Sequence, residues 1–140
     1  MNLSIRNQLP GIVTSVTPGE VMATVKVRLA GGQDLTAAIT AEAVDELDLA
    51  PGASVSALVK STEVALATAA MEGMSIRNQL PGAVDDVTTG AAMASVKVTI
   101  VGGGTLTAVI TRDAADDLGL VAGSSVVALI KSTEISLATP

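Results

Sequence analysis

A tandem duplication limits the fold of this chain more than any other feature. Shifting the sequence against itself by about 71 residues aligns 4–68 with 75–139 without a gap, and roughly 40 of about 65 pairs are identical. The octapeptide SIRNQLPG is unchanged between the copies, at 4–11 and at 75–82. Each copy therefore has to encode the same small fold, and the copies can be compared position by position.

The duplication predicts two structural units of the same kind. We expect the first unit at 1–69, a linker at 70–74 and the second unit at 75–140. The linker contains one Gly and no Pro. A connection this short holds two units close together.

The apolar pattern within each copy is typical of β-strands. At 21–29 apolar residues alternate with polar ones, which is the period of a half-buried strand. The first copy predicts strands at 11–17, 21–29, 35–40, 54–60 and 63–68 and a helix at 41–47 capped by Thr40, and the second copy repeats them with a helix at 112–118 capped by Thr111. Five short strands and one short helix in each unit predict an all-β chain of two tandem OB-like five-stranded barrels.

The residue types that are missing exclude most catalytic chemistry. The chain has no Cys, His, Trp, Tyr or Phe. It therefore offers no imidazole base near neutral pH, no thiolate nucleophile and few of the usual zinc ligands. An enzyme is the least favoured class, and we expect no cofactor and no metal ion bound directly by side chains.

Charge and hydropathy limit the partners. The net charge of −6 and the lack of aromatic rings argue against nucleic acid, because phosphate binding needs many cations and base stacking needs rings. Hydrophobic residues make up 49% of the chain and the mean hydropathy is +0.57. The uncharged stretches are nevertheless too short to span a bilayer, and the N-terminus lacks a signal-peptide pattern. We expect no membrane partner and a protein that buries surface between subunits.

Three basic positions are shared by the two copies, and two of them stand among hydrogen-bond donors. The shared pairs are Arg6 with Arg77, Lys26 with Lys97, and Lys60 with Lys131. The first pair lies in Ser-Ile-Arg-Asn segments and the third in Lys-Ser-Thr segments, while Thr40 adds a hydroxyl beside helical N–H groups. Cations, hydroxyls and N–H groups together suit a small oxyanion held by hydrogen bonds.

Simpler interpretations of the same residues stay open at this point. Arg6 also fits an exposed or salt-bridged strand residue, Lys60 a solvated strand end, and Thr40 a helix cap. The carboxylates on the two short helices fit solubilising charge better than an acid–base pair. The glycine clusters lack the spacing and the lysine of a phosphate-binding loop and predict hairpin turns.

Three motifs of each copy resemble those of the molybdate-binding Mop domain, or molbindin, family. They are SIRNQLPG, LTAAIT or LTAVIT before the helix, and ALVKSTEVALA or ALIKSTEISLA at the end of the copy. The resemblance covers essentially the whole chain, and two such units in one chain resemble the tandem di-Mop proteins. It implies an OB-like fold, a homotrimer, and cytoplasmic binding, storage and homeostasis of molybdate or tungstate.

The resemblance also implies that each anion is held between neighbouring Mop units. The implied oxyanion-binding residues are Ser4, Ile5 through its backbone, Arg6, Thr40, Lys60 and Ser61 in the first copy, and Ser75, Ile76, Arg77, Thr111, Lys131 and Ser132 in the second. The family more often has Ala where Ile5 and Ile76 stand, and the larger side chain could tighten the pocket. The family has further sites on the threefold axis, for which 22–24 and 93–95 are candidates.

The main alternative is an anion-sensing oligomerisation module that signals occupancy to a separate partner protein. The chain contains no ATPase motif and no pair of DNA-binding helices, which disfavours a built-in output but not a separate partner. A third alternative, an OB-type nucleic-acid binder, is weakened by the charge and the missing aromatic residues.

Overall fold

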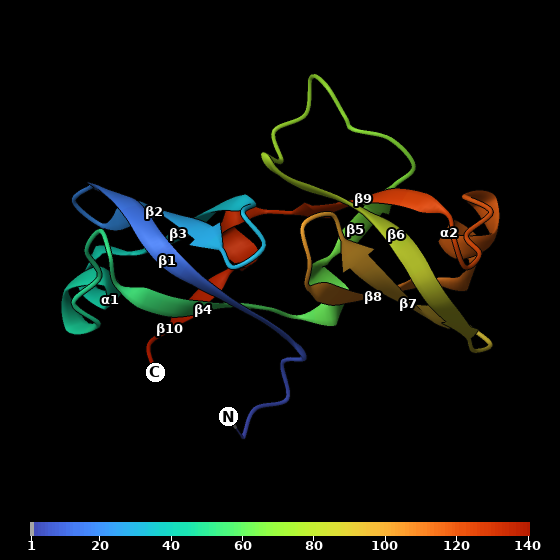
Figure 1. Ribbon diagram of the computed structural model, residues 1–140, viewed down its shortest axis with the longest axis horizontal. Coiled ribbons are helices and arrows are strands. Elements are labelled where there is room, and N and C mark those ends of the chain that lie inside the picture. Colours follow the sequence, from blue (N-terminus) through green and yellow to red (C-terminus); the bar gives the residue numbers. More distant parts are fainter. Residues whose placement is uncertain (1) are drawn as a thin grey trace.

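The computed structural model describes residues 2–140, which form two units side by side along the long axis of the molecule (Figure 1). The first copy supplies β1 (Asn7–Pro18), β2 (Met22–Leu29), β3 (Asp34–Thr40), α1 (Ala41–Glu46), β4 (Ser54–Val59), the 3₁₀ turn η1 (Ser61–Glu63) and β5 (Ala65–Ala67). The second copy supplies β6 (Asn78–Thr89), β7 (Met93–Ile100), β8 (Thr105–Thr111), α2 (Arg112–Asp117), β9 (Ser125–Ile130), the 3₁₀ turn η2 (Ser132–Glu134) and β10 (Ser136–Ala138). The two helices lie at the far ends of the molecule (Figure 1).

Each unit is a curled five-stranded sheet, and one strand of each sheet comes from the other copy. The strand orders are β10-β4-β1-β2-β3 and β5-β9-β6-β7-β8. Strand β5 pairs antiparallel with β9, and β10 pairs with β4, as Figure 1 shows for the red strand beside the green one. The predicted tandem β units are confirmed. The exchange was not predicted, because periodicity identifies a strand without identifying its partner.

Some element boundaries differ from the prediction for local reasons. Strand β1 starts at Asn7 rather than at residue 11, passing through Pro10, whose carbonyl accepts the Ala30 N–H at 3.0 Å. Strand β5 is shorter than the predicted 63–68, because the turn η1 closes first, with the Glu63 N–H donating to the Lys60 carbonyl at 2.9 Å. The helices end one residue early, at C-caps Leu47 and Leu118.

Aliphatic side chains build the hydrophobic core. In β2 the predicted inward face is buried at Ala23, Val25, Val27 and Leu29, whereas Val21 precedes the strand and is 74% exposed. One buried cluster runs through both units and includes Leu35 and Leu106, together with Val64 and Ile135 just before the exchanged strands. The units therefore share a core rather than touching only at their surfaces.

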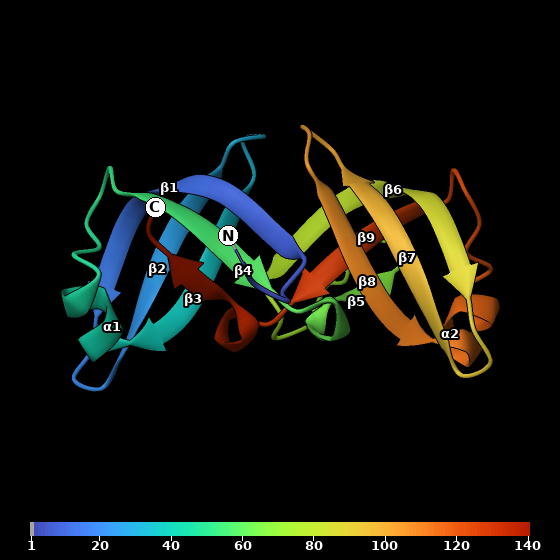
Figure 2. The same cartoon turned by 90° about the horizontal axis from the view of Figure 1, so that it is seen from below.

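Two glycine hairpins bring the units together at the centre of the molecule. The β2–β3 and β7–β8 turns lie next to each other in Figure 2, and a Cβ atom built on Gly102 would lie 2.5 Å from the carbonyl oxygen of Gly31. Gln33 donates from its side chain to the Val101 carbonyl across this contact. Only residues without side chains fit at such a close approach.

Candidate functional site

The second half of the octapeptide is structural. The Gln8 side chain donates to the Ile5 carbonyl at 3.0 Å, and Leu9 lies in the core. A Cβ atom on Gly11 would lie 2.7 Å from the Arg28 carbonyl oxygen, so the neighbouring strand requires Gly at this position. The same constraints hold in the second copy, at Gln79, Leu80 and Gly82. This explains half of the repeated motif without reference to a ligand.

The asparagine of the octapeptide joins the two units. Asn7 is 2% exposed, and its side-chain amide donates to the Thr107 carbonyl at 2.9 Å and accepts from the Thr107 N–H at 2.8 Å. Asn78 makes the reciprocal pair with Thr36 at 2.8 and 2.9 Å. Each amide thus pairs with an edge strand of the other unit as a neighbouring strand would. Arg6 and Arg77 directly precede these asparagines. The inter-unit bonds therefore also fix the position of the backbone from which each arginine side chain extends.

The remaining three residues of the first octapeptide meet the Lys-Ser-Thr segment. Ser4, Ile5, Arg6, Lys60, Ser61 and Thr62 line one hollow of about 240 Å³. This volume is below the roughly 300–1,000 Å³ typical of sites for organic ligands. The hollow combines two cationic side chains with three hydroxyls, and no carboxylate is among its lining residues within 2–140. The arrangement suits a small anion that accepts several hydrogen bonds.

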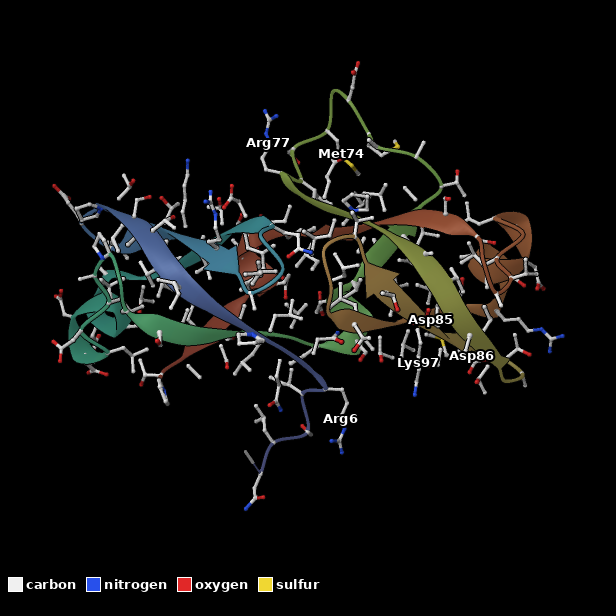
Figure 3. All side chains as sticks on the ribbon, viewed as in Figure 1. Arg6, Met74, Arg77, Asp85, Asp86 and Lys97 are labelled. Carbon is white, nitrogen blue, oxygen red and sulfur yellow. The ribbon has the colours of Figure 1, made fainter. Side chains whose placement is uncertain are left out.

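The second copy forms the matching hollow without its arginine. Ser75, Ile76, Lys131, Ser132 and Thr133 line a volume of about 280 Å³. Figure 3 shows Arg6 and Arg77 extending away from the body of the molecule on opposite sides. Both guanidinium groups are exposed and are therefore free to reach an anion or a neighbouring chain.

The two threonines that precede the helices have different positions relative to these hollows. Thr111 lines a third hollow of about 410 Å³ together with Thr62 of the first copy and Ile76 and Lys131 of the second. Thr40 is not among the residues that line the first hollow. Both threonines cap their helices as predicted, the hydroxyl oxygen accepting the N–H of Ala43 or Ala114 at 3.1 Å. A hydroxyl that accepts in this way keeps its own proton to donate.

The unshared arginines are occupied elsewhere. Within residues 2–140 the ion pairs are Arg28 with Asp34 at 3.0 Å and Arg112 with Asp116 at 3.9 Å. The hydrogen bond from Arg28 lowers the pKa of the Asp34 carboxyl and raises that of the guanidinium. Lys26, the third shared basic position of the first copy, is exposed. A larger hollow of about 580 Å³ is lined mostly by apolar residues. Its one cationic lining residue, Arg28, is already paired with Asp34.

Sequence reasoning left two lining residues out of the predicted set. Thr62 and Thr133 line the two small hollows, and the Lys-Ser-Thr pattern contained the signal because every residue in it is a donor. Within the part of the chain that the structure describes, no three or more His, Cys, Asp or Glu side chains lie together in a group that could hold a metal ion. Across the same residues, none of the helices has the length and apolar character needed to cross a membrane.

The fold and the hollows define a class of protein, a tandem pair of strand-exchanged β units that each present a small hollow lined by hydroxyls and at least one cation. Residues 3–66 and 74–137 each match the TOBE domain. The chain belongs to the TOBE domain family, which confirms the resemblance inferred from the motifs.

Relatives with one unit and with two units are similar to this chain. The molybdenum-pterin-binding protein MopB of Rhodobacter capsulatus is 45% identical over 141 residues, covering 100% of this chain and 52% of MopB. The chain therefore spans about half the length of that relative. Molybdenum-pterin-binding protein 2 of Clostridium pasteurianum is 44% identical over 64 residues, covering 46% of this chain and 94% of its own length. The crystal structure of the cytoplasmic molybdate-binding protein ModG, with molybdate bound, superimposes with a TM-score of 0.97 at 38% identity over 100% of both chains.

Proposed function

We propose that this chain binds molybdate or tungstate as the intact oxyanion and serves in cytoplasmic storage and homeostasis of that anion. The anions lie between Mop units of a homotrimer, held by Ser4, Ile5, Arg6, Thr40, Lys60 and Ser61 and by Ser75, Ile76, Arg77, Thr111, Lys131 and Ser132. The protein acts by binding and release, without catalysis.

One observation carries the proposal, namely the convergence of the Ser-Ile-Arg and Lys-Ser-Thr segments on one hollow. These segments lie far apart in the sequence, yet they line about 240 Å³ together. A tetrahedral dianion needs several donors at once and little competing carboxylate, and this set of residues meets both conditions. Because the chain carries a net charge of −6, attraction has to come from these local cations rather than from the general field.

The outward arginines support a site shared between chains. Arg6 and Arg77 are exposed and point away from the body of their own chain (Figure 3). An arginine in this position can reach across a subunit boundary and supply charge to an anion resting on its neighbour. The exposed Ile12, Met22 and Met93 side chains, each 44–46% exposed, offer apolar surface for such an assembly to bury.

The comparisons favour binding over the signalling alternative. ModG, described as a molybdate-binding protein, aligns with this chain over the full length of both. The ModG crystal structure holds molybdate, which supports binding of the anion as the role of a chain built in this way. A cytoplasmic location is proposed here on the same basis.

Calorimetric titration with sodium molybdate, tungstate, sulfate and phosphate tests the proposal. We expect molybdate and tungstate to bind and sulfate to bind far more weakly. The Arg6→Ala and Arg77→Ala double variant should lose most of the molybdate heat, because each anion loses a charge-assisted donor. The matched control is Arg28→Ala, which removes a cation that is already paired outside the small hollows.

Light scattering provides the test of assembly. A trimer mass agrees with sites shared between chains, whereas a monomer that binds molybdate normally would refute the shared geometry. Absence of molybdate heat in the wild type, or undiminished heat in the double variant, would refute the site.

A further inference from the structure

The segment between the two copies is bound to the second copy through one glutamine. The Met71 N–H donates to the Gln79 side-chain oxygen at 3.0 Å, and the Gln79 side-chain nitrogen donates back to the Met71 carbonyl at 2.9 Å. The same nitrogen donates to the Ile76 carbonyl at 3.1 Å. Gln79 lies on β6, opposite Leu129 of β9, so its backbone is fixed by the sheet. The side chain thus ties both ends of the turn from Met71 to Ile76 to a rigid strand.

In the first copy Gln8 makes the bond that corresponds to one of these three. Among residues 2–140 the equivalent Gln8 side chain makes one hydrogen bond, to the Ile5 carbonyl at 3.0 Å. The bond to the residue three positions earlier is therefore common to both copies, and the two bonds to Met71 are the ones that tie the linker to the second copy.

The braced segment carries part of the second hollow. Ser75 and Ile76 line it together with Lys131, and Ile76 also lines the neighbouring hollow that contains Thr111. Both residues lie inside the turn that Gln79 closes. Donors that are ordered before the anion arrives lose less conformational entropy on binding.

We propose that Gln79 and the linker backbone at Met71 are positioning elements for the second anion site. This inference rests on the proposed function. Gln79 does not contact the anion. It holds Ser75 and the Ile76 backbone in the binding geometry, so the second site releases molybdate more slowly in the wild type than in a chain that lacks these bonds.

The test compares substitutions at equivalent positions of the full-length chain. Gln79→Leu removes all three bonds, and Gln8→Leu is the matched control that removes one. NMR titration with sodium molybdate reports each site separately, through the amide signals of 4–6 and of 75–77. We expect Gln79→Leu to weaken molybdate binding at the second site by about fivefold to tenfold and to speed release of the anion. The loss of one to two net hydrogen bonds that order the binding segment corresponds to a change of about this size. Gln8→Leu should weaken the first site by about threefold or less.

A second variant separates bracing from general damage to the fold. Met71→Pro removes a single backbone donor at a residue whose side chain is 45% exposed, and should reproduce part of the Gln79→Leu effect at 75–77 with the melting temperature unchanged. Hydrogen exchange of the anion-free wild type provides an independent measure, since the Met71 amide should be protected.

The outcomes distinguish this inference from the function on which it rests. A wild type that binds no molybdate refutes the proposed function and the bracing with it. An unprotected Met71 amide, or a Gln79→Leu chain with an unchanged second site, refutes the bracing alone.

Discussion

Replacing Asn7 tests whether the octapeptide joins the two units. Asn7→Ala removes two hydrogen bonds of 2.9 and 2.8 Å and leaves the N–H and carbonyl of Thr107 without partners. Two bonds at about 0.5–1.5 kcal/mol each, plus incomplete solvation of a half-buried strand edge, give a loss of about 2–4 kcal/mol in the free energy of unfolding. For a chain of this length that lowers the melting temperature by about 7–14 °C.

Asn7→Asp sharpens the same test because it changes one atom. The introduced carboxylate oxygen faces the Thr107 carbonyl at a position that is 2% exposed, and an unpaired buried charge costs about 3–5 kcal/mol. Burial raises the pKa of a carboxyl group in the folded state. The deficit relative to wild type is therefore largest at neutral pH and shrinks as the pH falls through the raised pKa, where the protonated group can donate to Thr107 again.

Urea unfolding followed by far-ultraviolet circular dichroism is the appropriate assay, since the chain has no aromatic residue for fluorescence. All variants are compared at one protein concentration, because assembly contributes to apparent stability. Asn2→Ala, at an exposed position, is the control and should stay within about 0.5 kcal/mol of wild type. A loss of less than about 0.5 kcal/mol for Asn7→Ala, or an Asn7→Asp chain as stable as Asn7→Ala at neutral pH, would refute the reasoning.

Four further results are expected. Gly11→Ala forces a Cβ atom to 2.7 Å from the Arg28 carbonyl oxygen and should destabilise the protein by about 1–3 kcal/mol in urea; wild-type stability would contradict the close approach. Thr40→Val should cost about 0.5–2 kcal/mol through loss of the helix cap while Thr40→Ser costs little, and equal losses would show that the cap is not the cause. The Asp34 carboxyl, whose pKa is lowered by its bond from Arg28, stabilises the folded state above the unfolded pKa and loses this effect as the pH falls through the folded value; NMR titration of Asp34 should give a normal pKa in Arg28→Ala. Molybdate affinity should change little between about pH 6 and 8, because Lys and Arg stay protonated there and the chain has no His; a steep loss by calorimetry would point to another group.

The sequence was sufficient to predict the two β units, the helix caps and the outward face of β2, because these depend on local pattern. The threonine caps at Thr40 and Thr111 depend on a donor three residues away, and the alternation in β2 depends on nearest neighbours. Comparing the copies also selected Arg6 and Lys60 from eight cations, and the structure brings both to one hollow.

Features that depend on distant parts of the chain were not predictable. The sequence presents Asn7 only as one more donor beside Arg6, although its amide bonds to Thr107, 100 residues away in the sequence. Nothing in the pattern of 65–67 indicates that it pairs with 127–129 rather than with its own copy. Strand partners and inter-unit bonds are set by three-dimensional packing, which a single sequence does not encode as a periodic signal.

The exchanged strands give the duplication a physical meaning. One copy alone would lack the strand that covers the β4 edge and would carry β5 with no sheet to join. Two separate copies could exchange these strands only by associating, at a rate that falls with dilution. A linker of a few residues instead holds the two copies at an effective concentration in the millimolar range. The fused gene product is therefore an obligate dimer made covalent. Cutting the linker should leave the halves paired. Either half expressed alone should have to dimerise with a second copy of itself to complete its sheet.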